Sequence, residues 1–116
     1  MKVEIQELGE VTVVSPHGRL DALTSPELSE TLAPLLDEPT PVVILDMTHV
    51  PFVSSAGLRV VIETAKQMMG RGRLGVCGLT RQVHEIFQLA GFDRILTICD
   101  DVASTQQTLN EPDPTG

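Results

Sequence analysis

Two neighbouring serines are the residues of this sequence best placed to do chemistry. Ser54-Ser55-Ala56-Gly57 comes shortly after an apolar run and opens a segment with helical spacing. The first N–H groups of a helix have no intrahelical partners, and the helix dipole gives that end a partial positive charge. A phosphate on a serine at this place would be tolerated or stabilised. The pattern is compatible with a phosphorylation site at one of these two serines.

The same serines have two other interpretations. Serine at a helix start is most often an N-cap, whose oxygen accepts a hydrogen bond from the first turn. Serine can also be a catalytic nucleophile, but no glycine stands two residues before Ser54 or Ser55, as a GxSxG elbow requires. A nucleophilic serine also needs a positioned base, and no histidine is placed beside it by the sequence. The pattern therefore disfavours an enzyme, whereas a purely structural role of the serines as N-caps stays possible.

Motifs for cofactors are missing from the sequence. It has neither a GxxxxGK[ST] loop nor a GxGxxG turn. The histidines, at positions 17, 49 and 84, lack the spacing of zinc ligands. Cys77 and Cys99 lie in separate apolar runs, which predicts buried, reduced thiols. We therefore expect no cofactor, no metal and no catalytic residue.

Two charged residues could act together with the serines. Asp21 lies in a loop that we expect at the same end of the sheet, where it could contact a partner or help to position Ser55. It could equally form an Asx turn before a helix that begins at Ser25. Arg59, one turn into the helix that follows Ser54, could pair with a partner or with a phosphate, although a solvated side chain is the simpler role.

Length and charge limit the class of protein. The chain has 116 residues, 41% hydrophobic and 21% charged, as expected for one globular domain. Its formal net charge is −8, without a cluster of Lys or Arg, which argues against nucleic acid and anionic membranes as partners. A basic protein surface fits better. No signal peptide and no apolar stretch of roughly 20 residues is found, so we expect a cytoplasmic protein.

Strands and helices are expected to alternate. Apolar alternation and short apolar runs predict strands at 3–8, 11–15, 42–45, 74–77 and 95–98. One helix is expected to have Ser25 as its N-cap and Pro26 as its first residue, and a second to begin at Ser54. Thr80 is expected to cap a third helix, and Asp100 or Asp101 a short final one. Their predicted buried faces are Leu28, Leu32, Leu35 and Leu36 in the first helix, Leu58, Val61, Ile62, Ala65 and Met69 in the second, and Val83, Phe87, Leu89 and Ala90 in the third.

The predicted order is ββαβαβαβα, which indicates a single α/β domain. Alternating strands and helices favour right-handed crossovers and a mostly parallel central sheet, with the first strand antiparallel at one edge and about four helices. The domain is expected to span residues 1–109. Residues 110–116 have little to bury and are expected to be a disordered tail.

Four segments, in the right order, resemble one family. Residues 18–21 (GRLD) resemble a G-x-L-D loop, and residues 43–53 resemble a central strand and the approach to a switch. Residues 54–58 (SSAGL) resemble the signature D-S-[ST]-G-L, and residues 89–92 (LAGF) resemble L-x-G-[LF]. From about residue 3 to 109, the chain resembles the STAS domain of bacterial anti-sigma factor antagonists.

The resemblance implies a role for each residue of the signature. Ser55 takes the position of the phosphorylated serine, Ser54 replaces the usual aspartate, and Ala56 replaces the second hydroxyl residue. A neutral Ser54 can orient the acceptor only as a hydrogen-bonding group, and this departure from the signature makes Ser54 the second candidate for phosphorylation. The partner-binding residues implied or suggested here are Asp21, Ser54, Ser55, Ala56, Gly57 and Arg59.

The family also implies partner switching. The unmodified protein would bind an anti-sigma factor that is a serine kinase with the ATP-binding, histidine-kinase-like fold, and a metal-dependent serine phosphatase would reverse the phosphorylation. The alternative is a stand-alone STAS adaptor or scaffold whose partner binding does not depend on phosphorylation. The effect of charge at Ser55 on partner binding separates these two hypotheses.

Overall fold

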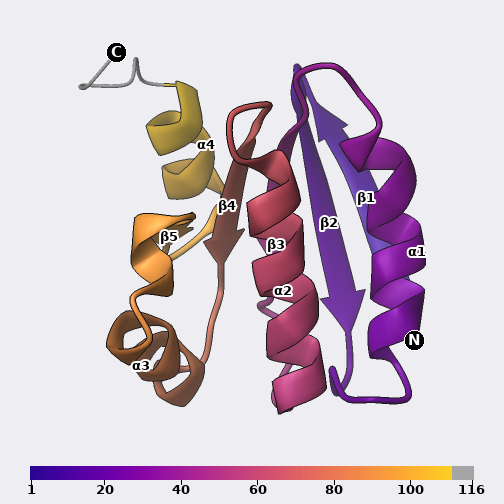
Figure 1. The fold of residues 1–116 in the computed structure, drawn as a ribbon, viewed down its shortest axis with the longest axis vertical. Coiled ribbons are helices and arrows are strands. Elements are labelled where there is room, and N and C mark those ends of the chain that lie inside the picture. The colour runs from indigo at the N-terminus through magenta and orange to yellow at the C-terminus, as the bar shows by residue number, and fades with distance from the viewer. Residues whose placement is uncertain (111–116) are drawn as a thin grey trace.

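The alternation of strands and helices is present in the structure, a computed structural model that describes residues 1–110 (Figure 1). The elements are β1 (Lys2–Leu8), β2 (Val11–His17), α1 (Ser25–Leu36), β3 (Val42–Asp46), α2 (Ser55–Met68), β4 (Arg73–Cys77), α3 (Arg81–Leu89), the 3-10 helix η1 (Phe92–Arg94), β5 (Thr97–Cys99) and α4 (Val102–Asn110). The predicted order is confirmed. Asn110, assigned to the expected tail, ends α4 instead, and the rest of that tail lies outside the described residues.

One sheet of five strands carries the fold, in the order β1-β2-β3-β4-β5. β1 pairs antiparallel with β2, and the other neighbours are parallel, which confirms the predicted α/β sheet with an antiparallel edge strand. The carboxyl ends of β2, β3 and β4 therefore meet at one end of the sheet. The loop with Asp21 follows β2 there, and the loop that leads to Ser55 follows β3.

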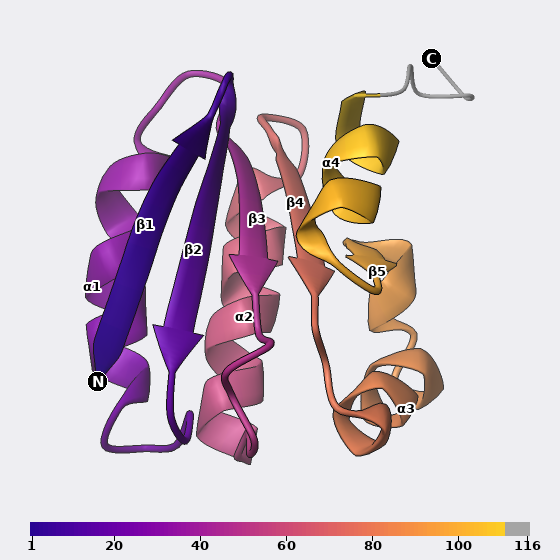
Figure 2. The same cartoon turned by 180° about the vertical axis from the view of Figure 1, so that it is seen from behind.

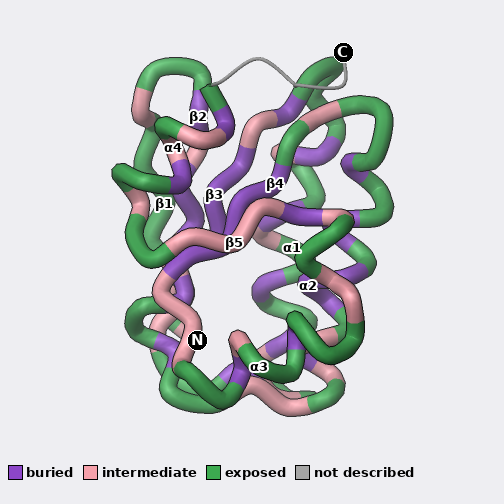
Figure 3. Tube along the Cα trace, turned by 90° about the vertical axis from the view of Figure 1, so that its left-hand side faces the viewer, coloured by how far each residue is buried: buried purple, intermediate pink, exposed green. Residues whose placement is uncertain are grey.

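Helices cover the two faces of the sheet unequally. α1 and α2 lie side by side on one face, whereas α4 covers β3, β4 and β5 on the other (Figures 1 and 2). β3 is thus buried from both sides: Val43 and Leu45 pack in the cluster with α1 and α2, and Ile44 packs in the cluster with Leu109 of α4. This explains its continuous apolar run, which is buried in Figure 3.

Close packing fixes α4 against the sheet. At Gly75 in β4, an added Cβ would overlap Cγ2 of Thr105 and would lie 3.2 Å from Cδ1 of Leu109. Asp101 caps the helix, because its Oδ1 accepts a hydrogen bond of 2.8 Å from the amide of Ser104. Within residues 1–110, no helix has both the length and the apolar character needed to cross a membrane.

The start of α1 differs from the prediction. Thr24, not Ser25, precedes the helix, and Ser25 is its first residue. Ser25 is buried, and its hydroxyl donates a hydrogen bond of 2.5 Å to the carbonyl oxygen of Asp21. Because the carbonyl oxygen of Asp21 accepts the bond of the Ser25 hydroxyl, the Ser25 side chain is buried and does not cap the helix. The prediction that Ser25 is the N-cap is therefore wrong.

Three predicted buried residues are exposed. Met69 lies beyond the last residue of α2, and Leu89 and Ala90 lie at the end of α3. A position two residues after Phe87, the buried anchor of α3, is rotated by about 200° around the helix. Leu89 therefore points away from the core cluster that contains Phe87.

The last strand also begins later than predicted, at Thr97 and not at residue 95. The 3-10 helix η1 ends at Arg94, and Ile95 closes it by donating its amide hydrogen bond to Phe92 O at 3.1 Å. The residue expected to open the strand is thus held in a turn.

Candidate functional site

The two serines at the start of α2 have different environments. Ser54 is the N-cap, with an extended backbone (φ −83°, ψ 175°), and its Oγ accepts a hydrogen bond of 3.3 Å from the amide of Gly57. Ser55 is the first residue of the helix and is exposed. Within residues 1–110, the Ser55 hydroxyl makes no hydrogen bond. Ser54 is thus occupied in the cap, and Ser55 presents a free hydroxyl.

Backbone pairing connects the loop after β2 to the residues just before α2. Leu20 forms an isolated parallel bridge with Val53. The amide of Leu20 donates to the carbonyl oxygen of Phe52, and the amide of Ser54 donates to the carbonyl oxygen of Leu20, both at 2.9 Å. The position of Ser54, and therefore of Ser55, is set by a loop more than 30 residues earlier in the chain.

Gly57 permits the close approach of these two segments. A Cβ added there would lie 2.8 Å from both Cγ and the carbonyl oxygen of Leu20, and 2.9 Å from Cγ1 of Val53. Real Cβ atoms essentially never come so close to other atoms. The glycine of the signature is therefore required by packing of the first turn of α2 against Leu20.

Asp21 forms an Asx turn. Its Oδ1 accepts hydrogen bonds from the amides of Leu23 at 3.0 Å and Thr24 at 3.2 Å. The bond from the Thr24 amide is the main reason that the pKa of the Asp21 carboxyl is lowered, and desolvation acts in the opposite direction. The structure thus brings Asp21 to the end of the sheet where Ser55 lies and gives its carboxylate a local structural role. Contact of Asp21 with a partner stays a prediction.

The other two predicted site residues differ in exposure. Ala56 is half-buried, and Arg59 is exposed on the second turn of α2. In the part of the chain that the structure describes, the Arg59 side chain makes no ion pair or hydrogen bond. Arg59 is therefore a solvated side chain in this structure.

Comparison with known proteins identifies the family. The model of the STAS domain matches residues 2–105. The chain belongs to the STAS domain family. The match includes the loop with Asp21, the two serines and every strand, so the resemblance found in short motifs extends over the whole sheet.

Several proteins similar to this STAS chain carry the name anti-sigma factor antagonist. The chain is 31% identical over 101 residues to BtrV of Bordetella bronchiseptica, whose naming as an anti-sigma factor antagonist is provisional; the match covers 86% of this chain and 87% of BtrV. A solved anti-sigma factor antagonist from Mycobacterium paratuberculosis has a TM-score of 0.86 at 20% identity, covering 95% of this chain and 94% of that one. The Bacillus cell fate determinant SpoIIAA in its phosphorylated form has a TM-score of 0.69 at 12% identity, covering 92% and 99%.

Sequence reasoning missed two exposed apolar side chains on the loops that meet at Leu20. Leu23 is 86% exposed in the Asp21 turn, and Phe52 is 41% exposed just before the cap. The guanidinium of Arg19 lies over the Phe52 ring, 4.4 Å from its centroid. No local pattern could have revealed this contact, because it depends on the pairing of two distant loops at Leu20.

A histidine pair was also missed. The rings of His17 and His49 stack with their centroids 4.4 Å apart and an angle of 9° between their planes. The amide of Gly18 donates to the carbonyl oxygen of His49 at 2.9 Å, so the stack adds to the contacts between the same two loops. In the described part of the chain, no three His, Cys, Asp or Glu residues are grouped so that they could hold a metal ion.

The two cysteines are free thiols. Cys77 is buried as predicted, but Cys99 is only half-buried, because it lies in the short last strand at the edge of the sheet. Burial is the main cause that raises the pKa of the Cys77 thiol to about 12. Cys77 is therefore protonated at neutral pH and unsuited to nucleophilic chemistry.

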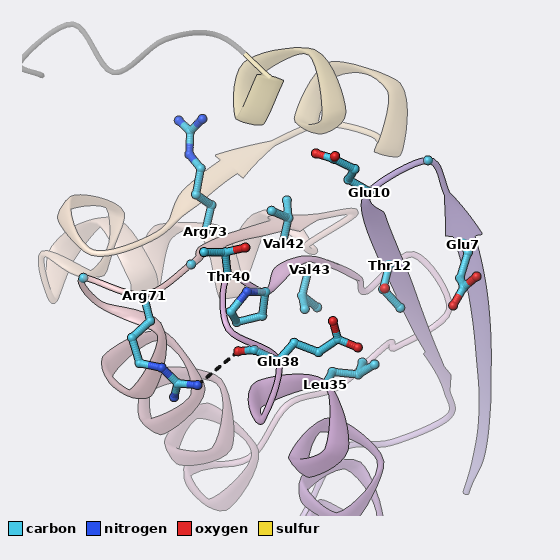
Figure 4. A pocket seen from close by; sticks show the side chains of 14 residues that line it. Glu7, Glu10, Thr12, Leu35, Glu38, Thr40, Val42, Val43, Arg71 and Arg73 are labelled. Carbon is cyan, nitrogen blue, oxygen red and sulfur yellow. Dashed lines mark hydrogen bonds between the residues drawn. The ribbon is translucent and has the colours of Figure 1, made fainter.

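A cavity of about 690 Å³ lies at the other end of the sheet (Figure 4). Its walls are the β1–β2 turn and the loops that precede β3 and β4, whereas the STAS serines follow the far end of β3. Arg71, one of its lining residues, donates hydrogen bonds to the carbonyl oxygens of Leu36 at 2.6 Å and Glu38 at 3.2 Å. Arg71 thus caps the carboxyl end of α1. The cavity is not lined by Ser54 or Ser55.

Proposed function

We propose that this STAS chain is an anti-sigma factor antagonist controlled by phosphorylation of Ser55. In its unmodified form it binds an anti-sigma factor that is also a serine kinase, of the ATP-binding, histidine-kinase-like fold, and so frees a sigma factor. Phosphorylation releases the kinase. The chain acts as a cytoplasmic binding module, not as an enzyme. The regulator names among its relatives support this role.

One observation carries the choice of residue. The Ser55 hydroxyl is exposed and free of hydrogen bonds, whereas the Ser54 oxygen is held by the Gly57 amide as the N-cap. In the transfer, a bond forms between Ser55 Oγ and the γ-phosphorus of ATP, the bond from that phosphorus to ADP breaks, and the hydroxyl proton passes to a base on the kinase. A metal-dependent phosphatase restores the serine by hydrolysis.

The physical basis of release is local electrostatics. A phosphoserine adds roughly −1.5 to −2 charges at neutral pH. The start of α2 tolerates this charge in the free protein, because unpaired amides and the helix dipole face it. In a complex, a phosphate packed against apolar or acidic kinase surface would lose water without compensation. A loss of about 3 kcal/mol weakens binding on the order of a hundredfold, without a change of fold.

The test is the intact mass after incubation with ATP, Mg²⁺ and the candidate kinase from the same genome. Wild type and Ser54→Ala should each gain one phosphate, and Ser55→Ala should gain none. A phosphate on Ser55→Ala would show that another residue is phosphorylated, and Ser54 would be the next candidate. No gain in any of the three, with the kinase active on another substrate, would favour the adaptor without phosphorylation control.

A further inference from the structure

The negative charge of this chain is concentrated at one edge of its sheet. Residues 2–10 and 25–38 contain β1, the turn after it, α1 and the two residues after α1. They hold seven acidic residues and one basic residue, Lys2, whereas the rest of the sequence holds nine acidic and seven basic residues. We call these two segments together the acidic edge. Its charge is suited to attract a basic partner.

The main chain of β1 has unused hydrogen-bonding groups. In the sheet of the described residues, β1 is an edge strand and pairs only with β2, from Lys2 to Leu8. Alternate N–H and C=O groups of an edge strand point away from its neighbour, where another extended chain can pair with them. Figure 2 shows β1 as the outermost strand, with α1 behind it. The free side of β1 therefore has room for one more strand.

Ile5 gives the acidic edge an apolar centre. Its side chain is 53% exposed, although Ile5 lies in the middle of β1. Ile5 is opposite Val14 in the register of β1 and β2. Val14 packs in the cluster that holds Leu28 and Leu32 of α1. Because paired residues share a face of the sheet, Ile5 lies on the α1 face, and an added strand can cover it with an apolar side chain.

The side of α1 next to β1 is acidic. Glu27, in the first turn of α1, binds the amino group of Met1 at 2.5 Å, which ties the start of the helix to the start of β1. Glu30 follows three residues later and lies within about 60° of Glu27 around the helix axis. Both side chains are exposed. They therefore place negative charge on the side of α1 that is closest to β1.

The cavity shown in Figure 4 extends the acidic edge. Glu7 and Glu10, at the end of β1 and in the turn after it, line this cavity together with Glu38. Within residues 1–110, the three carboxylates make no hydrogen bond and no ion pair. The basic residues of the lining, Arg71 and Arg73, donate to main-chain carbonyl oxygens. The cavity thus presents carboxylates that can bind the Lys or Arg side chains of a partner.

We propose that the acidic edge docks a basic, extended segment of a protein partner, which adds to β1 as a further strand of the sheet. Main-chain hydrogen bonds to β1 supply affinity, and the side chains of the segment supply specificity. An apolar side chain covers Ile5, and Lys or Arg side chains bind the carboxylates of the cavity. The charge disfavours a second copy of this chain as the occupant, because charged edge strands oppose self-pairing.

The inference is independent of the proposed function. The acidic edge does not include Ser54 or Ser55, and its cavity lies at the opposite end of the sheet from these serines. A segment bound along β1 therefore leaves Ser55 accessible to a kinase. The chain can then hold a second, basic partner while its serine is modified.

Two double variants separate the acidic edge from the net charge. Glu7→Lys with Glu30→Lys reverses two charges of the acidic edge. Glu85→Lys with Asp93→Lys reverses two charges on α3 and η1, which lie beside β5 at the opposite edge of the sheet. All four side chains are exposed, so both variants should keep the fold. The net charge changes by the same amount in both.

The test is a fluorescence-anisotropy titration, at physiological salt, with a labelled peptide of alternating Lys and Val and with a second peptide in which proline replaces each valine. Both peptides carry the same charge, but proline has no N–H group and cannot pair in a sheet. The valine peptide should bind at least about tenfold more tightly than the proline peptide. Its affinity should fall about tenfold or more for Glu7→Lys with Glu30→Lys, and should stay within about twofold for Glu85→Lys with Asp93→Lys.

The opposite results are distinct. No binding of the valine peptide, equal affinities for the two peptides, or equal losses in the two double variants would each overturn the inference. Amide hydrogen exchange locates the contact: exchange in residues 2–8 should slow when the valine peptide binds, and slowing only elsewhere would overturn the inference. A dimer of the chain alone with protected β1 amides would assign the edge to a second copy. None of these outcomes bears on phosphorylation of Ser55, which the intact-mass experiment tests.

Discussion

The amide of Ser54 donates a hydrogen bond of 2.9 Å to the carbonyl oxygen of Leu20. This bond joins the loop after β2 to the start of α2. Because Ser54 also caps the helix, one residue connects the backbone of the Leu20 loop to the first turn that carries Ser55. The Ser55 hydroxyl is therefore placed on a rigid support, although it makes no hydrogen bond of its own in the described structure.

Gly57→Ala should destabilise the domain by about 1–3 kcal/mol, because the new Cβ must push Leu20 or Val53 aside. Urea unfolding of the variant measures this loss. Arg59→Ala on the same helix is the control, since its exposed side chain makes no ion pair or hydrogen bond within residues 1–110; it should change stability by less than about 0.5 kcal/mol. Equal stability of Gly57→Ala and wild type would show that α2 does not need this close approach.

Ser54→Ala and Ser55→Ala should differ in their effect on the free energy of unfolding. Ser54→Ala removes the oxygen that accepts from the Gly57 amide and should cost about 1 kcal/mol, the usual effect of losing an N-cap. Ser55→Ala removes a hydroxyl without partners and should leave the urea midpoint nearly unchanged. The opposite ranking would mean that Ser55, not Ser54, caps the helix in solution.

Asp21 should make stability depend on pH in the acidic range. Its pKa in the folded protein is lowered from the usual 3.8 by the hydrogen bonds of its turn. A lowered folded-state pKa stabilises the protein above the unfolded-state value, and this stabilisation is lost as the pH falls through the folded-state pKa. In urea unfolding at a series of pH values, Asp21→Ala should therefore be less stable than wild type at neutral pH. The difference should shrink below about pH 3.8.

A difference that stays constant down to the lowest pH would contradict this role for the Asp21 charge. Glu30→Ala is a suitable control, because the Glu30 carboxylate is exposed on α1 and makes no hydrogen bond or ion pair within the described residues. Its stability should follow that of wild type through the same pH range.

The order of the elements could be predicted because its signals are local. In α1, the spacing of Leu28, Leu32 and Leu36 marks a buried face, and all three are buried in the structure. In β3, a continuous apolar run indicates cover on both faces, which α2 and α4 provide. Apolar residues that repeat every two to four positions can be recognised in a single sequence, without knowing which elements pack against them.

Details that depend on distant contacts could not be predicted. Ser25 stands before Pro26, as an N-cap often does, yet its hydroxyl bonds to the Asp21 carbonyl oxygen and Ser25 becomes the first residue of the helix. Leu89 is apolar, yet it lies where nothing of the described chain covers it. At the site, the sequence left open whether Ser54 or Ser55 is the cap. The hydrogen bond from the Gly57 amide to Ser54 Oγ distinguishes them in the structure. The stacking of Arg19 on Phe52 has no local signal at all.

The most direct test of the account is the affinity of the ADP-bound kinase for the unmodified chain and for the chain phosphorylated at Ser55, measured by calorimetry at one salt concentration. The account predicts tight binding of the unmodified form and a loss on the order of a hundredfold for the phosphorylated form, about 3 kcal/mol. Equal affinities for the two forms would contradict it and would identify the chain as an adaptor whose binding ignores the charge at Ser55.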